Sequence, residues 1–278
     1  MIEFSVLMGV YIKDRPKWVS EALDSMLNQT VKPSEILIVQ DGPITKELEE
    51  TIEKYINENS IVKLIKFEQN RGVGATMQDA VPLAKYDYIA RMDSDDISVK
   101  ERFEKEIKFL EENPDYDGVG SVVIEFEDGK NPFESTIFRN LPETNEEIIK
   151  WSKGRCPLQQ STVMLKKEAI LKAGGYREFY LVEDYDLFIR MISNGSKFYN
   201  FQEPLTYMRI NKDFFNRRGG LKYYKSIHKF KKYMYQSGHI TYMQYLKTNT
   251  ASLIVCLMPG FLRTYIYKKL LRKKKKGN

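Results

Sequence analysis

The segment Tyr86-Asp87-Tyr88-Ile89-Ala90-Arg91-Met92-Asp93-Ser94-Asp95-Asp96 joins a short apolar run to three carboxylates. The apolar run predicts a buried strand, so the carboxylates would lie at its carboxyl end. Like charges this close repel one another, and packing gives no reason to gather them there. One explanation is a divalent cation, Mg²⁺ or Mn²⁺, because hard cations prefer carboxylate oxygens. The alternative is a solvated turn whose aspartate caps a helix over residues 97–112.

The first half of the chain repeats this pattern of an apolar run followed by a polar loop. We expect strands at residues 4–10, 35–40, 61–67 and 86–92, and amphipathic helices at 18–27, 44–57 and 74–83. Near-continuous apolar runs suit strands covered on both faces, and alternating β and α units predict a right-handed parallel sheet. Ligands bind such sheets beyond the carboxyl ends of the strands, where the loops that follow them converge.

Beyond residue 112 the pattern is less regular. We expect strands at 117–126 and 161–165, helices at 143–150 and 184–193, and edge strands at 197–201 and 205–210. From about residue 218 onward the sequence is helical, with tyrosine and lysine interleaved. The chain is therefore expected to divide into an α/β domain, residues 1–212, and a basic, aromatic-rich helical extension, residues 213–278.

Charge is distributed unevenly along the chain. Residues 204–278 contain 18 lysines and arginines and one acidic residue, whereas residues 1–203 contain 26 basic and 37 acidic residues. This contrast indicates the kind of partner rather than the fold. Nucleic-acid binding is disfavoured because the larger part of the chain is acidic.

The basic extension contains an apolar segment. Residues 251–262 are apolar and include Pro259, which is too short a stretch for a bilayer span of about 20 residues. Arg263, Lys268, Lys269 and residues 272–276 follow, with tyrosines and leucines between them. This pattern predicts an interfacial helix on an anionic membrane surface, and a solvated helix end with a disordered tail is the alternative.

The location expected for the chain is cytoplasmic, peripheral on the inner face of the membrane. The apolar start lacks a basic region and a cleavage site, so a first strand is expected there rather than a secretory signal. Cys156 and Cys256 lie far apart without CxxC spacing, which suits a reduced protein better than a disulfide or a zinc site.

Polar side chains follow three other elements. Asp41 comes after the second predicted strand, where its carboxylate could accept the imide N–H of a uracil. Asn70-Arg71-Gly72-Val73-Gly74 follows the third and offers a cation and a helix start for a phosphate, although a glycine turn with a surface arginine fits equally well. Glu183-Asp184-Tyr185-Asp186 could be the acidic first turn of a helix, or it could supply a general base through Asp184.

Six motifs in order resemble those of glycosyltransferase family 2. They are Ser5-Val-Leu-Met-Gly-Val-Tyr11, Ser25-Met-Leu-Asn-Gln-Thr30, Ile38-Val-Gln-Asp-Gly42, Asn70-Arg-Gly72, Met92-Asp-Ser-Asp-Asp96 and Glu183-Asp-Tyr-Asp-Leu187. The resemblance covers residues 1 to about 212 and is strongest to bacterial enzymes that assemble capsule, exopolysaccharide or lipopolysaccharide. It implies a GT-A fold, which is a Rossmann-like, mostly parallel sheet flanked by helices, and an inverting transfer of a sugar from a nucleotide diphosphate.

The resemblance also implies roles for the matching positions. Those expected to bind the nucleotide are Val10, Tyr11, Asp41, Arg71 and Asp93. Asp93 and Asp95 match the aspartate pair that holds the ribose and a diphosphate bound to Mn²⁺ or Mg²⁺. Asp184 matches the catalytic base. Contacts with the donor or the acceptor are expected from Glu183, Gln159 and Gln160. Arg217 and Arg218 lie beyond the residues that the resemblance covers, and they are expected to reach the diphosphate from a mobile loop.

The chain departs from the family pattern at two places. Gln40 stands before Asp41-Gly42 where relatives often carry a second aspartate, which makes the nucleobase preference less secure. Cys156-Pro-Leu-Gln-Gln-Ser-Thr162 stands where many relatives carry a histidine, so Gln159 or Gln160 is expected either to touch a sugar or to pack in the core.

A UDP-sugar is the expected donor, with a dTDP-sugar as the alternative, and a saccharide or lipid-linked saccharide is the expected acceptor. Two other functions remain open. A sugar-nucleotide pyrophosphorylase would carry a Gly-rich, Arg-containing loop after the first strand, where this chain has Gly9-Val-Tyr-Ile-Lys-Asp14. A non-catalytic scaffold of a polysaccharide assembly complex is disfavoured by the carboxylates at Asp93, Asp95 and Asp184.

Overall fold

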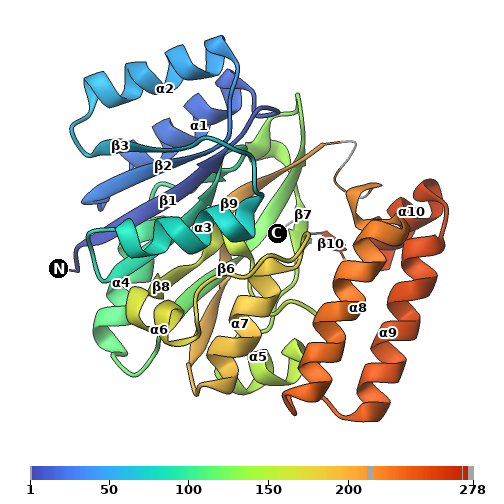
Figure 1. Ribbon diagram of the computed structural model, residues 1–278. Coiled ribbons are helices and arrows are strands. Elements are labelled where there is room, and N and C mark those ends of the chain that lie inside the picture. Colours follow the sequence, from blue (N-terminus) through green and yellow to red (C-terminus); the bar gives the residue numbers. More distant parts are fainter. Residues whose placement is uncertain (1, 212–213, 215, 271, 275–278) are drawn as a thin grey trace.

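The computed structural model describes residues 2–211, 214, 216–270 and 272–274 (Figure 1). Helices cover both faces of a central sheet, and a group of C-terminal helices stands beside it. In the described part of the chain the strand order is β10-β7-β6-β8-β4-β1-β2-β3, and outside this path β9 pairs with β6 while β5 pairs with β9. The α/β fold expected from the sequence is confirmed, although the sheet as a whole is mixed.

The N-terminal half is built from four parallel strands and the helices that connect them. The strands are β1 (Phe4–Val10), β2 (Glu35–Asp41), β3 (Val62–Phe67) and β4 (Tyr88–Asp93), in the order β4-β1-β2-β3. The helices are α1 (Pro16–Leu27), α2 (Lys46–Glu58) and α3 (Val73–Ala80). The Thr45 side chain accepts the N–H of Leu48 and so caps α2, whereas Pro82 helps end α3 in the short turn η1 (Val81–Leu83).

Two apolar clusters cover the two faces of this sheet. On one face, β-strand residues such as Phe4 and Val6 pack against Val19 and Leu23 of α1 and Leu48 of α2. On the other face, Leu7 and Val39 pack against Met77 of α3 and Leu187 of α7 (Glu183–Ser193). Because successive strand residues alternate between these clusters, the N-terminal strands are buried on both sides, as their apolar sequences predict.

The segment after the aspartates differs from the predicted helix. Ile97–Ser98 forms β5, which pairs with Tyr207 and Thr206, and helix α4 begins only at Arg102 and ends at Glu112. The N-cap of α4 is Glu101, and the Asp96 carboxylate instead accepts the backbone N–H of Arg209. The interpretation of the tetrad as a cap for the following helix is therefore wrong.

The second half of the sheet is made by residues far apart in sequence. Strand β6 (Gly118–Glu127) is antiparallel to β7 (Ile137–Arg139) and β8 (Met164–Lys166), and parallel to β9 (Phe198–Ile210). The two predicted edge strands at 197–201 and 205–210 are one strand, β9, and an irregularity between Ser121 and Val123 adjusts its register. The remaining elements are η2 (Pro132–Glu134), α5 (Asn145–Ser152), η3 (Gln160–Thr162) and α6 (Lys167–Lys172).

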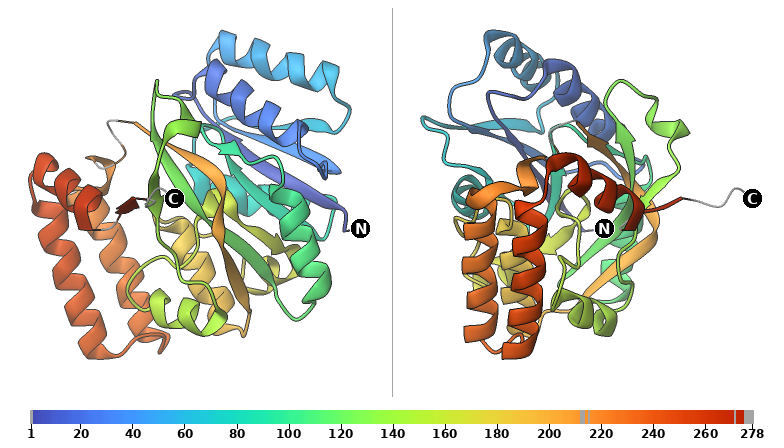
Figure 2. Two further views of the ribbon diagram at one scale, coloured as in Figure 1. Left: turned by 180° about the vertical axis from the view of Figure 1, so that it is seen from behind. Right: turned by 90° about the vertical axis from the view of Figure 1, so that its right-hand side faces the viewer.

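The C-terminal extension packs against the α/β domain. The predicted boundary at residues 212 and 213 lies outside the described residues. The extension contains η4 (Asn216–Arg218), α8 (Gly220–Gln236), α9 (Tyr242–Leu257), α10 (Gly260–Leu270) and β10 (Arg272–Lys274). Helices α8 and α9 lie side by side (Figure 2). Phe230 and Met234 of α8 share an apolar cluster with Tyr185 and Ile189 of α7, so the extension is anchored to the helix that carries Asp184.

The last helix of the extension, α10, is followed by a short strand that the sequence did not predict, and the expected binding to a membrane surface stays a prediction. The helix ends at Leu270, and β10 pairs antiparallel with β7. Arg263 is buried and donates to the carbonyl of Met258 at the end of α9, so its charge is used inside the protein. A Cβ on Gly219 would clash with the Arg263 guanidinium where it now lies. Within the described residues, we find no helix whose length and apolarity suit a membrane crossing.

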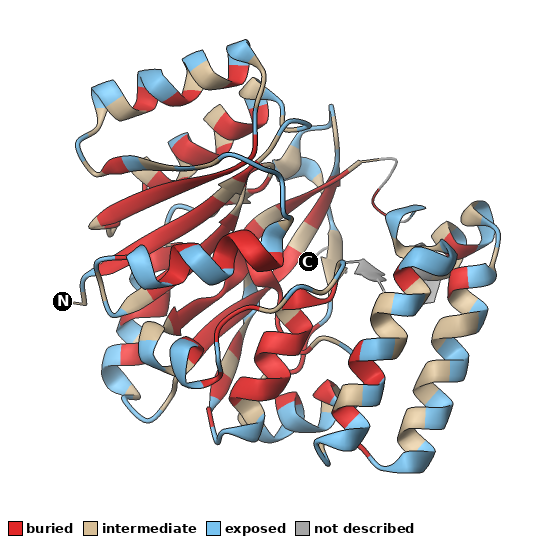
Figure 3. Cartoon of the chain, viewed as in Figure 1, coloured by how far each residue is buried: buried red, intermediate tan, exposed pale blue. Residues whose placement is uncertain are grey.

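Burial is uneven across these layers. Buried residues concentrate in the sheet and α7, whereas α9 and α10 are mostly half-buried or exposed (Figure 3). Ile254, Leu257 and Phe261 are 58%, 59% and 79% exposed around the junction of α9 and α10. These three large apolar side chains therefore face solvent near the junction of the two helices.

Candidate active site

A cleft of about 1960 Å³ lies at the carboxyl ends of β1, β2 and β4. All the site residues expected from the sequence line it, and they are Val10, Tyr11, Asp41, Arg71, Asp93, Asp95, Gln159, Gln160, Glu183, Asp184, Arg217 and Arg218. The fold thus gathers side chains from across the chain, including the helical extension, on the walls of one cleft.

Asp41 holds two loops together at one end of the cleft. Its carboxylate accepts the backbone N–H groups of Arg71 at 2.8 Å and Gly72 at 2.9 Å. Gly42 follows with a φ of 82°, and a Cβ there would lie 2.6 Å from the backbone nitrogen of Asn70. Each carboxylate oxygen keeps a further lone pair, so Asp41 can still accept a hydrogen bond from a ligand.

The Arg71 side chain has partners within the protein. Its guanidinium pairs with Asp79 at 2.7 Å and lies over the ring of Phe67 at 4.9 Å. The Arg71 side chain is therefore a surface arginine, as the alternative interpretation predicted. Its backbone N–H donates a hydrogen bond to Asp41.

The aspartate turn, residues 93–96, is contacted by the buried Arg91 and by Asp14. Arg91 donates to the carbonyl of Leu7 at 2.5 Å, and its Nη2 lies 3.8 Å from Oδ1 of Asp93. Asp14 accepts the N–H of Tyr11 at 3.0 Å and the hydroxyl of Ser94 at 2.9 Å. Neither Arg91 nor Asp14 was predicted as a site residue, because no motif distinguishes them from ordinary strand and loop residues.

The protein surrounds the carboxylates of this turn, although the charged form of a carboxylate is more stable in water. Although 41% of the Asp93 side chain faces the cleft, the surrounding protein raises the pKa of Asp93, which Arg91 and Arg217 oppose. Burial, and then the charge of Asp93, raises the pKa of Asp95 to about 6. Burial and both neighbours raise the pKa of Asp96 well above its ordinary value, and Oδ2 of Asp96 is buried without a hydrogen-bond partner.

These observations fit a divalent cation. Bringing a cation to Asp93 and Asp95 would relieve their mutual repulsion, and carboxylate oxygens are the ligands that Mg²⁺ and Mn²⁺ prefer. Such ions are commonly held by one or two carboxylates together with substrate phosphates. The part of the chain that the structure describes has no group of three or more His, Cys, Asp or Glu side chains placed to hold a metal ion.

Asp184 lies in the first turn of α7, on the cleft wall. Its Oδ1 accepts the backbone N–H of Tyr185 at 2.6 Å, and burial raises the pKa of Asp184. For the neighbouring Glu183, burial and the charge of Asp184 raise the pKa to about 8, and Oε2 of Glu183 is buried without a partner. Burial therefore favours the protonated form of Glu183, which leaves Asp184 as the better site for the negative charge.

Asp186 belongs to the interior rather than to the cleft. It is fully buried, accepts hydrogen bonds from Nε of Arg177 at 2.8 Å and Nε of Arg190 at 2.9 Å, and does not line the cleft. Of the acidic residues in this motif, Asp186 is the one that fastens α7 to the preceding loop.

Gln160 begins η3 and Gln159 is the N-cap before it, and both the sugar-contact and the packing interpretations retain support. Gln159 accepts a hydrogen bond from Arg139 and also lies 3.3 Å from the sulfur of Met208. Gln160 lines the cleft, and its Nε2 is buried without a hydrogen-bond partner. Arg139 is a further cleft residue that the sequence analysis missed, because β7 was not predicted.

Arg217 and Arg218 reach the cleft from η4. Arg218 donates to the carbonyl of Phe214 at 2.8 Å and its guanidinium lies 4.0 Å from the centre of that ring. Burial raises the pKa of the acidic residues in the cleft, and the charges of the two arginines partly counter that rise. Arg217 lowers the pKa of Asp93 and Asp95, and Arg218 lowers the pKa of Glu183 and Asp184. The cleft thus has a basic side provided by the extension.

A mixed α/β sheet with paired aspartates after β4 and a carboxylate at the start of a later helix defines the class of GT-A glycosyltransferases. Residues 5–173 match the sequence model of Glycosyl transferase family 2, and the chain belongs to this family. It is an inverting glycosyltransferase of the kind that builds cell-surface polysaccharides.

Similar proteins agree with this assignment. An Escherichia coli protein named UDP-Gal:alpha-D-GlcNAc-diphosphoundecaprenol beta-1,3-galactosyltransferase is 38% identical over 98% of this chain and 97% of its own. The amylovoran biosynthesis glycosyltransferase AmsE of Erwinia amylovora is 31% identical over 96% of this chain and 98% of its own.

Solved structures share the fold. Residues 1–349 of S. aureus TarS, in complex with UDP-GlcNAc, match with a TM-score of 0.66 and 17% identity, over 96% of this chain and 75% of that one. A Pyrobaculum calidifontis mannosyltransferase in complex with GDP-Man and Mn²⁺ matches with a TM-score of 0.62 and 12% identity, over 95% of this chain and 79% of that one. GT-A structures of this kind therefore include one that binds a divalent metal.

Proposed function

We propose that this enzyme transfers a hexose from a UDP-sugar to a lipid-linked saccharide, and that UDP-galactose is the first donor to test. The observation that carries the proposal is the single cleft that holds Asp41, the aspartate turn and Asp184 together. The extensive similarity to a relative named for UDP-Gal and a diphosphoundecaprenol-linked sugar supports this choice of donor and acceptor. A dTDP-sugar is the alternative donor.

In this proposal the nucleotide occupies the end of the cleft near Asp41. Val10 and Tyr11 flank the nucleobase, and Asp41 accepts its imide N–H with the lone pairs that Arg71 and Gly72 leave free. Asp93 contacts the ribose. Arg71 acts through its backbone and through the shape of its loop, since its guanidinium pairs with Asp79.

The diphosphate lies against the aspartate turn. Asp95, with Asp93, would hold Mn²⁺ or Mg²⁺, and such an ion supplies charge that stabilises the leaving diphosphate. Arg217 and Arg218 line the same cleft and add positive charge where negative charge develops. Gln159, Gln160 and Glu183 line the space left for the sugars.

The transfer itself is a single displacement. The acceptor hydroxyl oxygen forms a bond to the anomeric carbon while the bond from that carbon to the diphosphate oxygen breaks, so the configuration inverts. The hydroxyl proton passes to Asp184, which acts as general base. Glu183 stays protonated beside it and can donate a hydrogen bond to a sugar hydroxyl.

A lipid-linked acceptor would reach the cleft from a membrane surface. Ile254, Leu257 and Phe261 form an exposed apolar corner, and Ser252 and Thr264 from the same two helices line the cleft. The proposal is that this corner enters the headgroup region of an anionic cytoplasmic leaflet, attracted by the basic extension. The enzyme would then be peripheral, with its cleft opening next to the lipid.

Calorimetry with a panel of nucleotide sugars tests the donor assignment. The panel contains UDP-galactose, UDP-glucose, UDP-GlcNAc and a dTDP-hexose, each with and without Mn²⁺. We expect UDP-sugars to bind best and only with the metal at full affinity. Preference for dTDP-sugars would overturn the donor choice, pyrophosphate consumption by the pure protein would favour a pyrophosphorylase, and binding without transfer or donor hydrolysis would favour a scaffold.

A further inference from the structure

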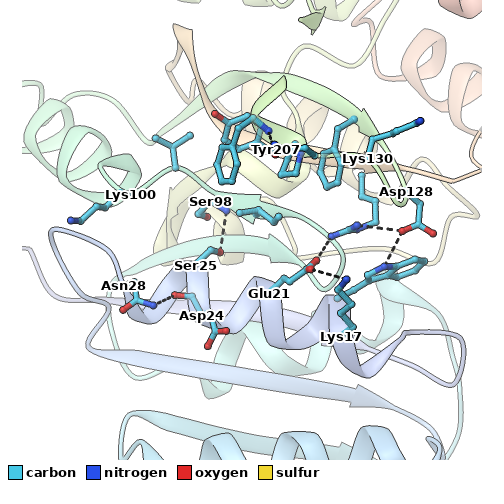
Figure 4. A pocket seen from close by; sticks show the side chains of 18 of the residues that line it. Lys17, Glu21, Asp24, Ser25, Asn28, Ser98, Lys100, Asp128, Lys130 and Tyr207 are labelled. Atoms are coloured by element: carbon cyan, nitrogen blue, oxygen red, sulfur yellow. Dashed lines mark hydrogen bonds and ion pairs between the residues drawn. The ribbon is translucent and has the colours of Figure 1, made fainter. Parts of the chain in front are cut away.

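A second cavity, which we call the side cavity, lies on the α1 side of the sheet. It has a volume of about 1100 Å³ and is bordered by α1, β5, β9 and the turn after β6 (Figure 4). Arg15, Trp18, Asp128 and Arg209 line both the side cavity and the active-site cleft. These residues therefore form the partition between the two spaces.

Side chains that line the side cavity hold the Arg209 guanidinium in place. Its guanidinium donates to Glu21 and, at 3.3 Å, to Asp128, both of which are labelled in Figure 4. The guanidinium also lies 4.6 Å from the ring centre of Phe126 and 5.3 Å from that of Trp18. The side chain is only 6% exposed, so water does not compete strongly for these bonds. A planar guanidinium with two carboxylates and two aromatic rings around it has little freedom to move.

On its other side Arg209 binds the aspartate turn. Its backbone N–H donates to Oδ1 of Asp96 at 2.9 Å, and its Nε donates to the carbonyl oxygen of Asp95 at 2.9 Å. The next residues of the turn, Ile97 and Ser98, pair with Tyr207 and Thr206 of the same strand as Arg209. Main chain and side chain of one residue thus fix the turn that carries the proposed metal ligands.

We infer that Arg209 is a positioning residue that sets the geometry of the Asp95-Asp96 turn for the metal and the diphosphate, with Glu21 in the side cavity and Asp128 in the partition as its anchors. The inference rests on the proposed function, because it assigns Arg209 to the metal site of that function. Outer residues that orient metal ligands usually change metal affinity by about 10- to 100-fold when removed.

Measuring Mn²⁺ affinity distinguishes a positioning role of Arg209 from direct contact of Arg209 with the diphosphate. The full-length protein is titrated with Mn²⁺ in the presence of UDP, and free Mn²⁺ is followed by electron paramagnetic resonance. The variants are Arg209→Gln and the double variant Glu21→Gln/Asp128→Asn, which leaves Arg209 in place but removes the charges of its anchors. Lys17→Ala is the control, since Lys17 pairs with Glu21 at 3.9 Å from the solvent side and is 84% exposed.

Both variants should raise the Mn²⁺ dissociation constant about 10-fold or more, while UDP binding without metal changes by less than about threefold. Lys17→Ala should behave as the wild type. Unchanged Mn²⁺ affinity in folded Arg209→Gln, or in the double variant if Arg209→Gln does not fold, would overturn the inference. A larger loss of metal-free UDP binding than of Mn²⁺ binding would instead mean that Arg209 touches the diphosphate and would also overturn it. If the wild type itself binds no Mn²⁺ with UDP, the proposed metal role fails.

Discussion

The thiol of Cys156 lies 3.9 Å from Oδ2 of Asp184, and both side chains belong to the same wall of the cleft. Burial raises the pKa of both groups, which keeps the thiol neutral and leaves the negative charge on the carboxylate. A general base works best when its pKa lies close to the working pH. The surroundings of Asp184 therefore suit proton transfer better than those of a solvated aspartate.

The acid limb of the pH–rate profile should reflect this environment. Only the carboxylate form of Asp184 can accept the acceptor proton, so kcat/KM should fall as the pH drops through the pKa of Asp184. Because burial raises that pKa, the fall should begin above the pH expected from the ordinary value of 3.8. UDP affinity measured over the same range distinguishes loss of the base from loss of donor binding. A rate that stays constant down to pH 4 would contradict the assignment.

Asp186→Asn should act on stability rather than directly on chemistry. The change weakens the acceptor of Arg177 and Arg190 inside the protein, which is expected to cost about 3 kcal/mol of unfolding free energy. Asp184→Asn is the matched control, since the same substitution two residues earlier removes no such pair. Urea denaturation measures both. Equal unfolding free energies for the two variants would show that Asp186 has no anchoring role.

Asp41→Asn should weaken nucleotide binding. The carboxylate accepts two backbone N–H groups, and an amide can offer only one oxygen to them, so the loop of Arg71 and Gly72 loses a charge-assisted hydrogen bond worth about 1.5 kcal/mol or more. We expect UDP affinity, measured by calorimetry, to fall about tenfold.

Asp79→Asn is the control for the Asp41 experiment. It weakens the partner of the Arg71 guanidinium but leaves the backbone contacts intact, so UDP affinity should change by less than about threefold. A larger loss of UDP affinity in Asp79→Asn than in Asp41→Asn would mean that the Arg71 side chain, rather than the loop backbone, organises the site.

The apolar corner of α9 and α10 should determine membrane binding. Leu257→Ser together with Phe261→Ser removes two exposed apolar side chains and should lower binding to phosphatidylglycerol vesicles at least about tenfold in a sedimentation assay. Leu83→Ser with Phe133→Ser is the control, because these side chains are 59% and 71% exposed elsewhere on the surface. Equal losses in the two double variants would argue against a specific membrane face.

Much of the N-terminal half could be predicted from the sequence. Strands such as Phe4–Val10 are continuous apolar runs between polar loops, so local pattern and tertiary burial agree. The second half could not be read in the same way. Strand β9 is interrupted by the exposed Gln202 and Glu203, and β5 has only two residues, so their pairing depends on partners about 100 residues away.

Some residues of the candidate site could likewise be predicted from the sequence, and others could not. Asp41 and Asp95 stand out because carboxylates at the ends of buried strands have few packing explanations, whereas Asp184 stands out through its match to a family motif. Arg91, Arg139 and Arg209 did not stand out, since an arginine in or beside a strand is usually a surface residue. Their importance comes from what they contact, such as the Leu7 carbonyl for Arg91 and the Asp95 carbonyl for Arg209.

The proposed chemistry is tested most directly by comparing transfer from UDP-galactose by the wild type and by Asp184→Asn, with Mn²⁺ and a lipid-diphosphate-linked saccharide. The account predicts that the variant loses at least about 100-fold in rate, since it cannot accept the proton, while its UDP-sugar dissociation constant stays within about threefold. A variant that transfers sugar at the rate of the wild type would contradict the account.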